Sequence, residues 1–180
     1  MRNYIMFEDL FEDGTLREYI ENNTNDPWVG TVWERYVFMS PKQKGEFGER
    51  LVDKFLTNKG HGVLRASTST AGHDRVVDDT LTEIKFSLAQ RNKGDVADDM
   101  FMINHVSIGK DWERLVFFGI NKYDEPRLVY FTKEDFIKNR EEFFKNQQGG
   151  KKIKNDDYIC SGKKVKELLD QDWVKDISEW

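Results

Sequence analysis

The stretch GHDRVVDDTLTEIKFS, residues 72–87, is the most informative part of the sequence for predicting the fold. It contains two runs with the composition of β-strands, 73–77 and 80–87, separated by Asp78 and Asp79. Two acidic residues between such runs are typical of the short turn of a β-hairpin. We therefore predict an antiparallel hairpin with these two residues as its turn.

The predicted hairpin brings two carboxylates together. In the register that a two-residue turn sets, Asp74 lies opposite Glu83, and Lys85 follows on the same face. Directly opposed residues have Cβ atoms roughly 4.5–5.5 Å apart. Two carboxylates at that separation repel each other unless another group neutralises them. The opposite face of the second strand presents Thr82, Ile84 and Phe86, which we assign to the core.

A hard divalent cation would neutralise these carboxylates. Mg²⁺ typically binds one or two protein carboxylates together with substrate phosphate oxygens. The alternative is a solvent-exposed cluster of Asp, Glu and Lys that binds nothing. The opposed Asp74, the glycine at Gly72 and the helix that precedes the hairpin favour the metal site.

A helix is predicted over residues 40–60. Ser40 and Gln43 form a capping-box pattern around Pro41, and Gly60 provides a stop. Spacing at 100° per residue collects one apolar stripe, made of Phe47, Gly48, Leu51, Val52, Phe55 and Leu56.

Glu49 lies just past the edge of this stripe, whereas Glu46 and Asp53 are expected further into solvent. A carboxylate at the margin either points toward the sheet, half-buried, or is an ordinary surface charge. Both interpretations of Glu49 remain open at this point.

The other segments complete an α/β pattern. We expect a mixed central β-sheet flanked by helices in a single domain, residues 1–180. Its parts are an N-terminal helical segment (1–39), a core (40–131) and C-terminal helix–strand–helix elements (132–180). Strands are predicted at 62–67, 114–121, 126–131 and 157–161, helices at 132–146 and 163–173, a weaker helix at 95–109, and a polar loop at 87–95.

The pattern resembles the PD-(D/E)XK nuclease superfamily, which has the restriction endonuclease-like fold. That family places an Asp on one strand of a hairpin and Glu/Asp-x-Lys on the next, as Asp74, Glu83 and Lys85 do here with eight residues between Asp74 and Glu83. Many members add a Glu from the preceding helix, which Glu49 matches. His73 stands where the family often has Pro.

The resemblance implies a mechanism. Asp74, Glu83 and the backbone carbonyl of Ile84 would hold Mg²⁺, with Mn²⁺ as a substitute, and Glu49 would help to place a second metal or its waters. Lys85 would orient or deprotonate the attacking water, or stabilise charge on phosphorus. Catalytic roles therefore fall on Asp74, Glu83, Lys85 and Glu49.

Candidate DNA contacts lie near the motif in the sequence. The predicted polar loop is placed to reach DNA, and its amide and guanidinium groups can read base edges. The candidates are Lys44, His73, Arg75, Gln90, Arg91, Asn92 and Lys93. Each of them is also compatible with ordinary solvated surface.

The remaining composition narrows the class of protein. The net charge of −5 disfavours a general nucleic-acid binder, although local patches decide phosphate contacts. One cysteine, Cys160, gives no internal disulfide. No membrane span, signal-peptide pattern, P-loop or dinucleotide fingerprint is seen, so we expect a cytoplasmic protein without a nucleotide cofactor.

The sequence thus predicts a Mg²⁺-dependent endonuclease acting on double-stranded DNA, sequence-specific in the manner of type II restriction enzymes. A junction-resolving, repair or phage nuclease is the alternative within this chemistry. A non-catalytic nucleic-acid-binding or interaction domain is the alternative from another class, and a metal-free Lys85–Glu83 salt bridge would favour it. Cutting both strands with one site per chain implies a homodimer or sequential nicks.

Overall fold

The computed structural model divides the chain into two compact units, Met1–Phe38 and Met39–Trp180. The sequence predicts one domain whose N-terminal helical segment ends at residue 39. The first unit contains helix α1 (Thr15–Asn23) and the 3₁₀ turn η2 (Tyr36–Phe38). The residues described are 14–23, 26–68, 71–89, 91–92, 95–96, 100–121, 123, 125–147 and 156–180.

The second unit is built on a six-stranded mixed sheet in the order β1-β2-β3-β7-β8-β11. Only the central β3–β7 pair is parallel, and every other neighbouring pair is antiparallel. This architecture confirms the predicted mixed α/β sheet. The strands are β1 (Val63–Arg65), β2 (Arg75–Val77), β3 (Thr80–Leu88), β7 (Arg114–Ile120), β8 (Pro126–Thr132) and β11 (Lys175–Asp176).

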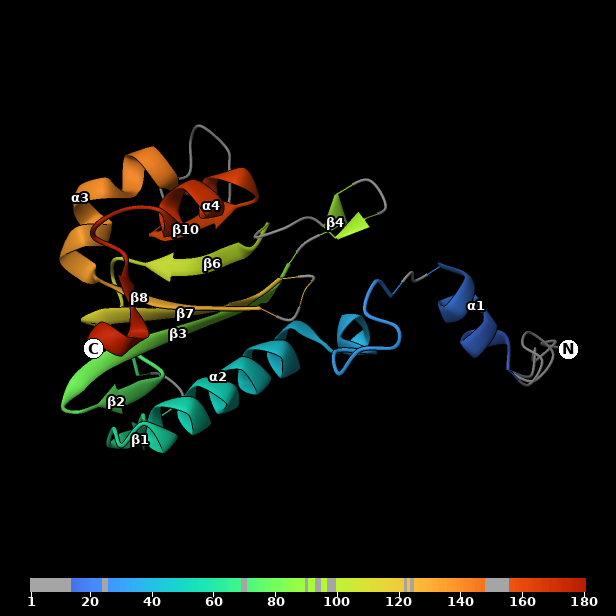
Figure 1. Ribbon diagram of the computed structural model, residues 1–180, viewed down its shortest axis with the longest axis horizontal. Coiled ribbons are helices and arrows are strands. Elements are labelled where there is room, and N and C mark those ends of the chain that lie inside the picture. The colour runs from blue at the N-terminus through green and yellow to red at the C-terminus, as the bar shows by residue number, and fades with distance from the viewer. Residues whose placement is uncertain are drawn as a thin grey trace, which may run out of the picture. The chain divides into compact units, whose positions relative to one another are not determined.

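The two faces of this sheet have different covers (Figure 1). Helix α2 (Pro41–Asn58) packs on one face, over an aliphatic core that includes Val52, Leu56, Ile84 and Val116. The other face is covered by a three-stranded sheet, β6-β10-β9, and by two helices. The bounds are β6 (Met102–Ser107), β9 (Lys145–Asn146), β10 (Asp157–Ser161), α3 (Lys133–Phe143) and α4 (Lys163–Leu169).

Aromatic side chains fill the layer between the two sheets. Phe117 of β7 contacts Phe101 edge-on, with ring centroids 5.5 Å apart, and Phe131 of β8 contacts Phe144 at 6.4 Å. Edge-to-face pairs of this kind add to the free energy gained by burying the rings. Glu83 is the register partner of Leu115 on β7, and both side chains are buried.

Helix α2 begins and ends where the sequence predicts. Both hydrogen bonds of the capping box are formed: Gln43 N–H donates to Ser40 Oγ at 3.3 Å, and Ser40 N–H donates to Gln43 Oε1 at 2.9 Å. At the other end, Gly60 has a φ of +95°, which a side chain would disfavour.

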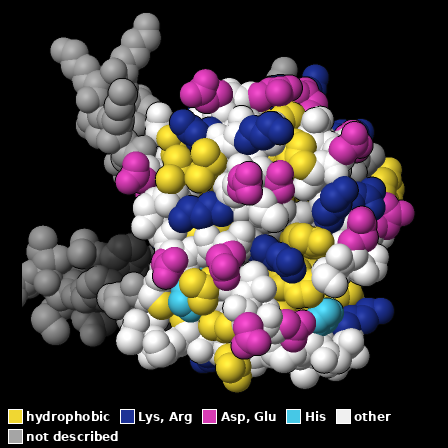
Figure 2. Space-filling model, turned by 90° about the vertical axis from the view of Figure 1, so that its left-hand side faces the viewer, with side chains coloured by type: hydrophobic (Ala, Val, Ile, Leu, Met, Phe, Trp, Pro, Cys, Tyr) yellow, Lys and Arg dark blue, Asp and Glu magenta, His cyan; other side chains and the backbone are white. Residues whose placement is uncertain are grey.

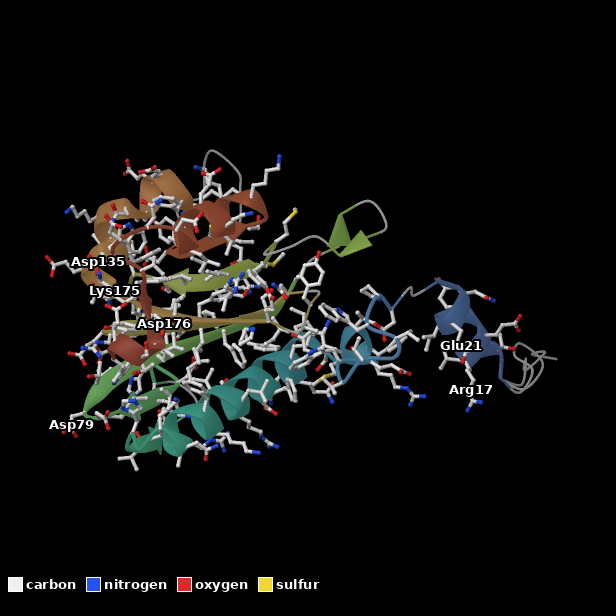
Figure 3. All side chains as sticks on the ribbon, in the orientation of Figure 1. Arg17, Glu21, Asp79, Asp135, Lys175 and Asp176 are labelled. Carbon is white, nitrogen blue, oxygen red and sulfur yellow. The ribbon has the colours of Figure 1, made fainter. Side chains whose placement is uncertain are left out.

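The hairpin has the predicted register and turn. Val77 pairs with Thr80 and Arg75 with Thr82, and the turn residues Asp78 and Asp79 have φ of 45° and 65°. Positive φ at both central residues defines the type I′ turn favoured in hairpins. Figure 3 labels Asp79 at the outer tip of this turn, where its side chain is exposed.

Two segments differ from the prediction. The described residues within 95–109 are not helical. They form β5 (Asp95–Val96) and β6, and β6 pairs with β10 while its Ile103 and Val106 are buried. Residues 87–95 are not simply a loop, since β3 extends to Leu88 and β4 (Arg91–Asn92) pairs with β5. Among the described helices, none is long and apolar enough to cross a membrane.

Candidate functional site

The candidate site is centred on Asp74, directly before strand β2. The β2–β3 ladder ends at the Arg75–Thr82 pair, and beyond it the Asp74 carboxylate replaces backbone as the acceptor: Ile84 N–H donates to Asp74 Oδ2 at 2.8 Å. Asp74 and Glu83 are thus close, as predicted, although the regular ladder stops one pair short of them. Burial, followed by the charge of Glu83, raises the pKa of Asp74 to about 6.

Glu83 is the most deeply placed group of the site, with an exposed fraction of 1%. Its Oε1 atom accepts hydrogen bonds from two lysines, Lys85 Nζ at 2.6 Å and Lys110 Nζ at 3.1 Å. Its Oε2 atom is buried and has no hydrogen-bond partner among the described residues. An unpartnered buried oxygen on a charged group is costly, so this atom points to a ligand.

The backbone carbonyl of Ile84 points to the same side of strand β3 as the Asp74 carboxylate. Residue 84 is beyond the last pair of the β2–β3 ladder, and its N–H is bonded by the Asp74 side chain. The N–H and C=O of one strand residue point to the same side of the strand. The Ile84 carbonyl therefore points away from β7, toward the side of β3 on which Asp74 lies.

Arg75 was predicted to be a DNA contact, but its side chain lies inside the protein. Its side chain is 3% exposed and forms a two-pronged pair with Asp53, with Nε to Oδ1 at 2.7 Å and Nη2 to Oδ2 at 2.9 Å. Its Nη1 atom donates to the Asp74 carbonyl at 2.7 Å and lies 3.0 Å from Glu49 Oε2. The guanidinium therefore joins helix α2 to the hairpin and is engaged by three partners inside the protein.

This arrangement decides between the two interpretations of Glu49. The Glu49 carboxylate points toward the sheet and is partly buried, with a side-chain exposed fraction of 23%. Asp53 was expected in solvent, but it is only 27% exposed because it pairs with Arg75. The charge of Glu49 also contributes to the raised pKa of Asp74.

A cleft of about 830 Å³ opens beside these groups. One wall comes from the segment between β1 and β2, and another from residues 109–111 of the loop between β6 and β7. The two loops touch at Gly72, where an added Cβ would lie 2.1 Å from the backbone nitrogen of Asp111. The glycine is therefore required by this close approach.

The other proposed DNA contacts have different positions. His73 lines the cleft, and its Nδ1 atom lies 3.2 Å from the carbonyl oxygen of Asp111. Lys44 is half-buried on α2 and is not among the cleft-lining residues. Arg91 and Asn92 form β4, while Gln90 and Lys93 lie outside the described residues.

Lys110 is the main residue of the site that the sequence did not reveal. It is 27 positions from Glu83 in the chain, and no short motif connects the two. A basic side chain directly after a glycine in the segment before a buried strand was the available signal, and it is weak.

The residues of the site fit a hard cation only if water molecules or a substrate supply the remaining ligands. In the part of the chain that the structure describes, no group of three or more His, Cys, Asp or Glu side chains is arranged to hold a metal ion. Asp74, Glu83 and the Ile84 carbonyl offer oxygen atoms, and Glu83 Oε2 is unpartnered. Mg²⁺ commonly binds in this way, keeping waters and substrate phosphate as its other ligands.

The surface charge around the turn end of the sheet is mixed. On the face shown in Figure 2, Lys and Arg side chains alternate with Asp and Glu side chains and do not gather into one basic field. That face therefore offers no continuous surface for a polyanion.

Comparisons with known proteins assign no family. No family model matches the chain, and no curated protein matches it significantly. Among solved structures, the chain is similar to a bacterial homing endonuclease, I-Ssp6803I, with 16% sequence identity and a TM-score of 0.43. The match covers 56% of this chain and 74% of that one. A similarity at this level does not assign an activity.

Proposed function

We propose that this protein is a metal-dependent endonuclease of the PD-(D/E)XK type that hydrolyses phosphodiester bonds in double-stranded DNA. The observation that carries the proposal is the buried, unpartnered Oε2 atom of Glu83 beside the carboxyl group of Asp74. Leaving a buried charged acceptor unsatisfied costs about 1–3 kcal/mol or more. A protein retains such an arrangement where a ligand offsets that cost.

The proposed ligand set uses oxygen atoms from the hairpin. Asp74, Glu83 and the Ile84 carbonyl would hold Mg²⁺, or Mn²⁺ in its place. Glu49 would hold water or a second ion through Oε1, since Oε2 is paired with Arg75. When bound, the divalent cation supplies polarisation of the scissile phosphate and lowers the pKa of a coordinated water.

In the proposed reaction, a water oxygen attacks phosphorus in line with the 3′ oxygen. The new P–O bond forms as the P–O3′ bond breaks, and a proton passes to the departing 3′ oxygen. The products are a 5′-phosphate and a 3′-hydroxyl. Lys85, whose Nζ is held 2.6 Å from Glu83 Oε1, would orient the water or stabilise the charge that develops on the phosphate.

Within this chemistry, we propose sequence-specific cutting in the manner of a type II restriction enzyme. A junction-resolving, repair or phage nuclease uses the same metal chemistry on a different DNA shape. Substrates of each shape therefore belong in the same assay. A homodimer would supply the second site needed to cut both strands together.

One observation favours a second candidate, a non-catalytic nucleic-acid-binding or interaction domain. Lys85 and Glu83 form the ion pair that such a domain would use to neutralise a buried carboxylate without metal. That pair leaves Glu83 Oε2 unpartnered and does not neutralise Asp74. For this reason we rank the nuclease first.

The test is a cleavage assay with Mg²⁺ on duplex, single-stranded and branched DNA. The wild type is compared with Asp74→Ala, Glu83→Ala and Lys85→Ala. Glu167→Gln is a matched control, because Glu167 forms a carboxylate–lysine pair with Lys164 on helix α4, outside the cleft. We expect fragments from the wild type and from Glu167→Gln, and none from the three site variants.

The pattern of products separates the candidates. Discrete fragments from long duplex DNA support sequence-specific cutting, and selective cutting of branched DNA supports a resolving enzyme. If the folded wild type is inert with Mg²⁺ and with Mn²⁺ on every substrate, the nuclease proposal fails. DNA binding that persists without cleavage would then favour the second candidate.

A further inference from the structure

Lys110 differs from Lys85 in its access to solvent, although both donate to the same oxygen of Glu83. The side chain of Lys85 is 15% exposed, and that of Lys110 is 42% exposed. Lys110 also lines the cleft, between Gly109 and Asp111. The outer lysine is thus in contact with the buried carboxylate and open to a molecule in the cleft.

The backbone that carries Lys110 is held from several sides. Lys133 Nζ donates to the Lys110 carbonyl at 2.5 Å. Trp112 is buried, and its Nε1 atom donates to the Ser107 carbonyl at 2.8 Å. With the close contact at Gly72, these bonds fix the loop while leaving the four-carbon side chain able to move.

The other cations that line the cleft are placed differently. The guanidinium of Arg75 is buried and engaged by Asp53 and Glu49. His73 is occupied at Nδ1 by the Asp111 carbonyl. Arg65 is exposed on β1, and among the described residues it forms no ion pair with a site carboxylate. Among the described residues that line the cleft, Lys110 is therefore the cation that both contacts Glu83 and is open to solvent.

We propose that Lys110 binds a backbone phosphate of the DNA next to the scissile one. This inference rests on the proposed function only in taking the cleft as the place where DNA binds. An ammonium group has three donors, and the bond to Glu83 uses one of them. Phosphate oxygens can accept the remaining two donors while the bond to Glu83 is kept.

The test is the salt dependence of binding to duplex DNA in EDTA, measured by fluorescence anisotropy. Each protein phosphate contact contributes about 0.9 to the slope of log affinity against log salt concentration. We expect Lys110→Met to weaken binding and to reduce this slope by about 0.9. Lys110→Arg keeps the charge and is expected to restore the slope.

Lys164→Met is the matched control. Lys164 is also half-exposed, at 47%, and also pairs with a glutamate, Glu167, but it does not line the cleft. Its substitution should leave affinity and slope unchanged. Urea unfolding of each variant tests whether Lys110 has only a structural role. In that case Lys110→Met would lower the free energy of unfolding and leave the salt slope unchanged.

The outcomes distinguish this inference from the proposed function. If Lys110→Met binds duplex DNA with the wild-type affinity and slope, the inference is overturned even where the wild type cleaves DNA. If the slope falls as expected but no DNA is cut, the inference stands and the nuclease proposal fails. Absence of any duplex binding by the folded wild type overturns both.

Discussion

Asp74 places an acidic group where its charged form is unfavourable. Its native pKa, about 6, is above the ordinary value of 3.8, so the native state holds this proton more tightly than the unfolded state does. Stability should therefore fall as pH rises from about 4 to about 6, and the cost is fully present above pH 6. The charged form of Asp74 thus lowers the stability of the metal-free protein at neutral pH.

We predict that Asp74→Asn stabilises the metal-free protein by roughly 2–3 kcal/mol at pH 8, and that the gain disappears below pH 4. The Asn side-chain oxygen can still accept the Ile84 N–H bond. Urea unfolding in EDTA at the two pH values measures this, with the exposed Asp170→Asn as control. Equal stability of wild type and Asp74→Asn at pH 8 would contradict it.

Arg75 stabilises the site from inside the protein. We predict that Arg75→Lys lowers the free energy of unfolding by about 2 kcal/mol, because lysine cannot reproduce the fork that binds Asp53. Arg65→Lys, at an exposed position on β1, should change it by less than about 0.5 kcal/mol. Urea unfolding provides the measurement. An Arg75→Lys variant as stable as the wild type would contradict this prediction.

At the scale of elements, the contact between α2 and β3 depends on Gly48. An added Cβ there would lie 2.1 Å from Phe86 Cβ and 2.6 Å from its Cγ atom. The close approach allows α2 to carry Glu49 and Asp53 to the guanidinium of Arg75. Helix position and site geometry are therefore coupled through one glycine.

We predict that Gly48→Ala destabilises the protein by about 1–3 kcal/mol through overpacking and reduces cleavage by shifting Glu49. Gly45 is the matched control in the same helix, with no atom within 4 Å of an added Cβ. Gly45→Ala should stabilise by up to about 1 kcal/mol, because alanine favours a helix more than glycine does. Thermal unfolding of both variants checks the opposite signs, and a stabilising Gly48→Ala would rule out the close contact.

At the scale of the whole molecule, a ligand that binds only the native site should stabilise the fold. We predict that Mg²⁺ raises the unfolding free energy of the wild type, by about 2.7 kcal/mol at one hundred times its Kd. The gain should disappear in Glu83→Gln and persist in Glu167→Gln. Calorimetric or urea unfolding at constant ionic strength measures this without any DNA, and equal gains in all three proteins would count against a site at Glu83.

By itself, the sequence determined the features that a few neighbouring residues encode. The type I′ turn at Asp78–Asp79, the register of the hairpin and the cap of α2 depend on local hydrogen bonds and on side-chain periodicity. The proximity of Asp74, Glu83 and Lys85 follows from that register, because strand geometry sets which side chains meet.

Only the tertiary structure decided the environment of these groups. The burial of Arg75, the inward position of Asp53 and the delivery of Lys110 to Glu83 result from packing between segments distant in the chain. The strand at 102–107 likewise forms because β10, at least fifty residues later in the chain, supplies its partner. Such contacts depend on long-range pairing and shared burial, which no local pattern encodes.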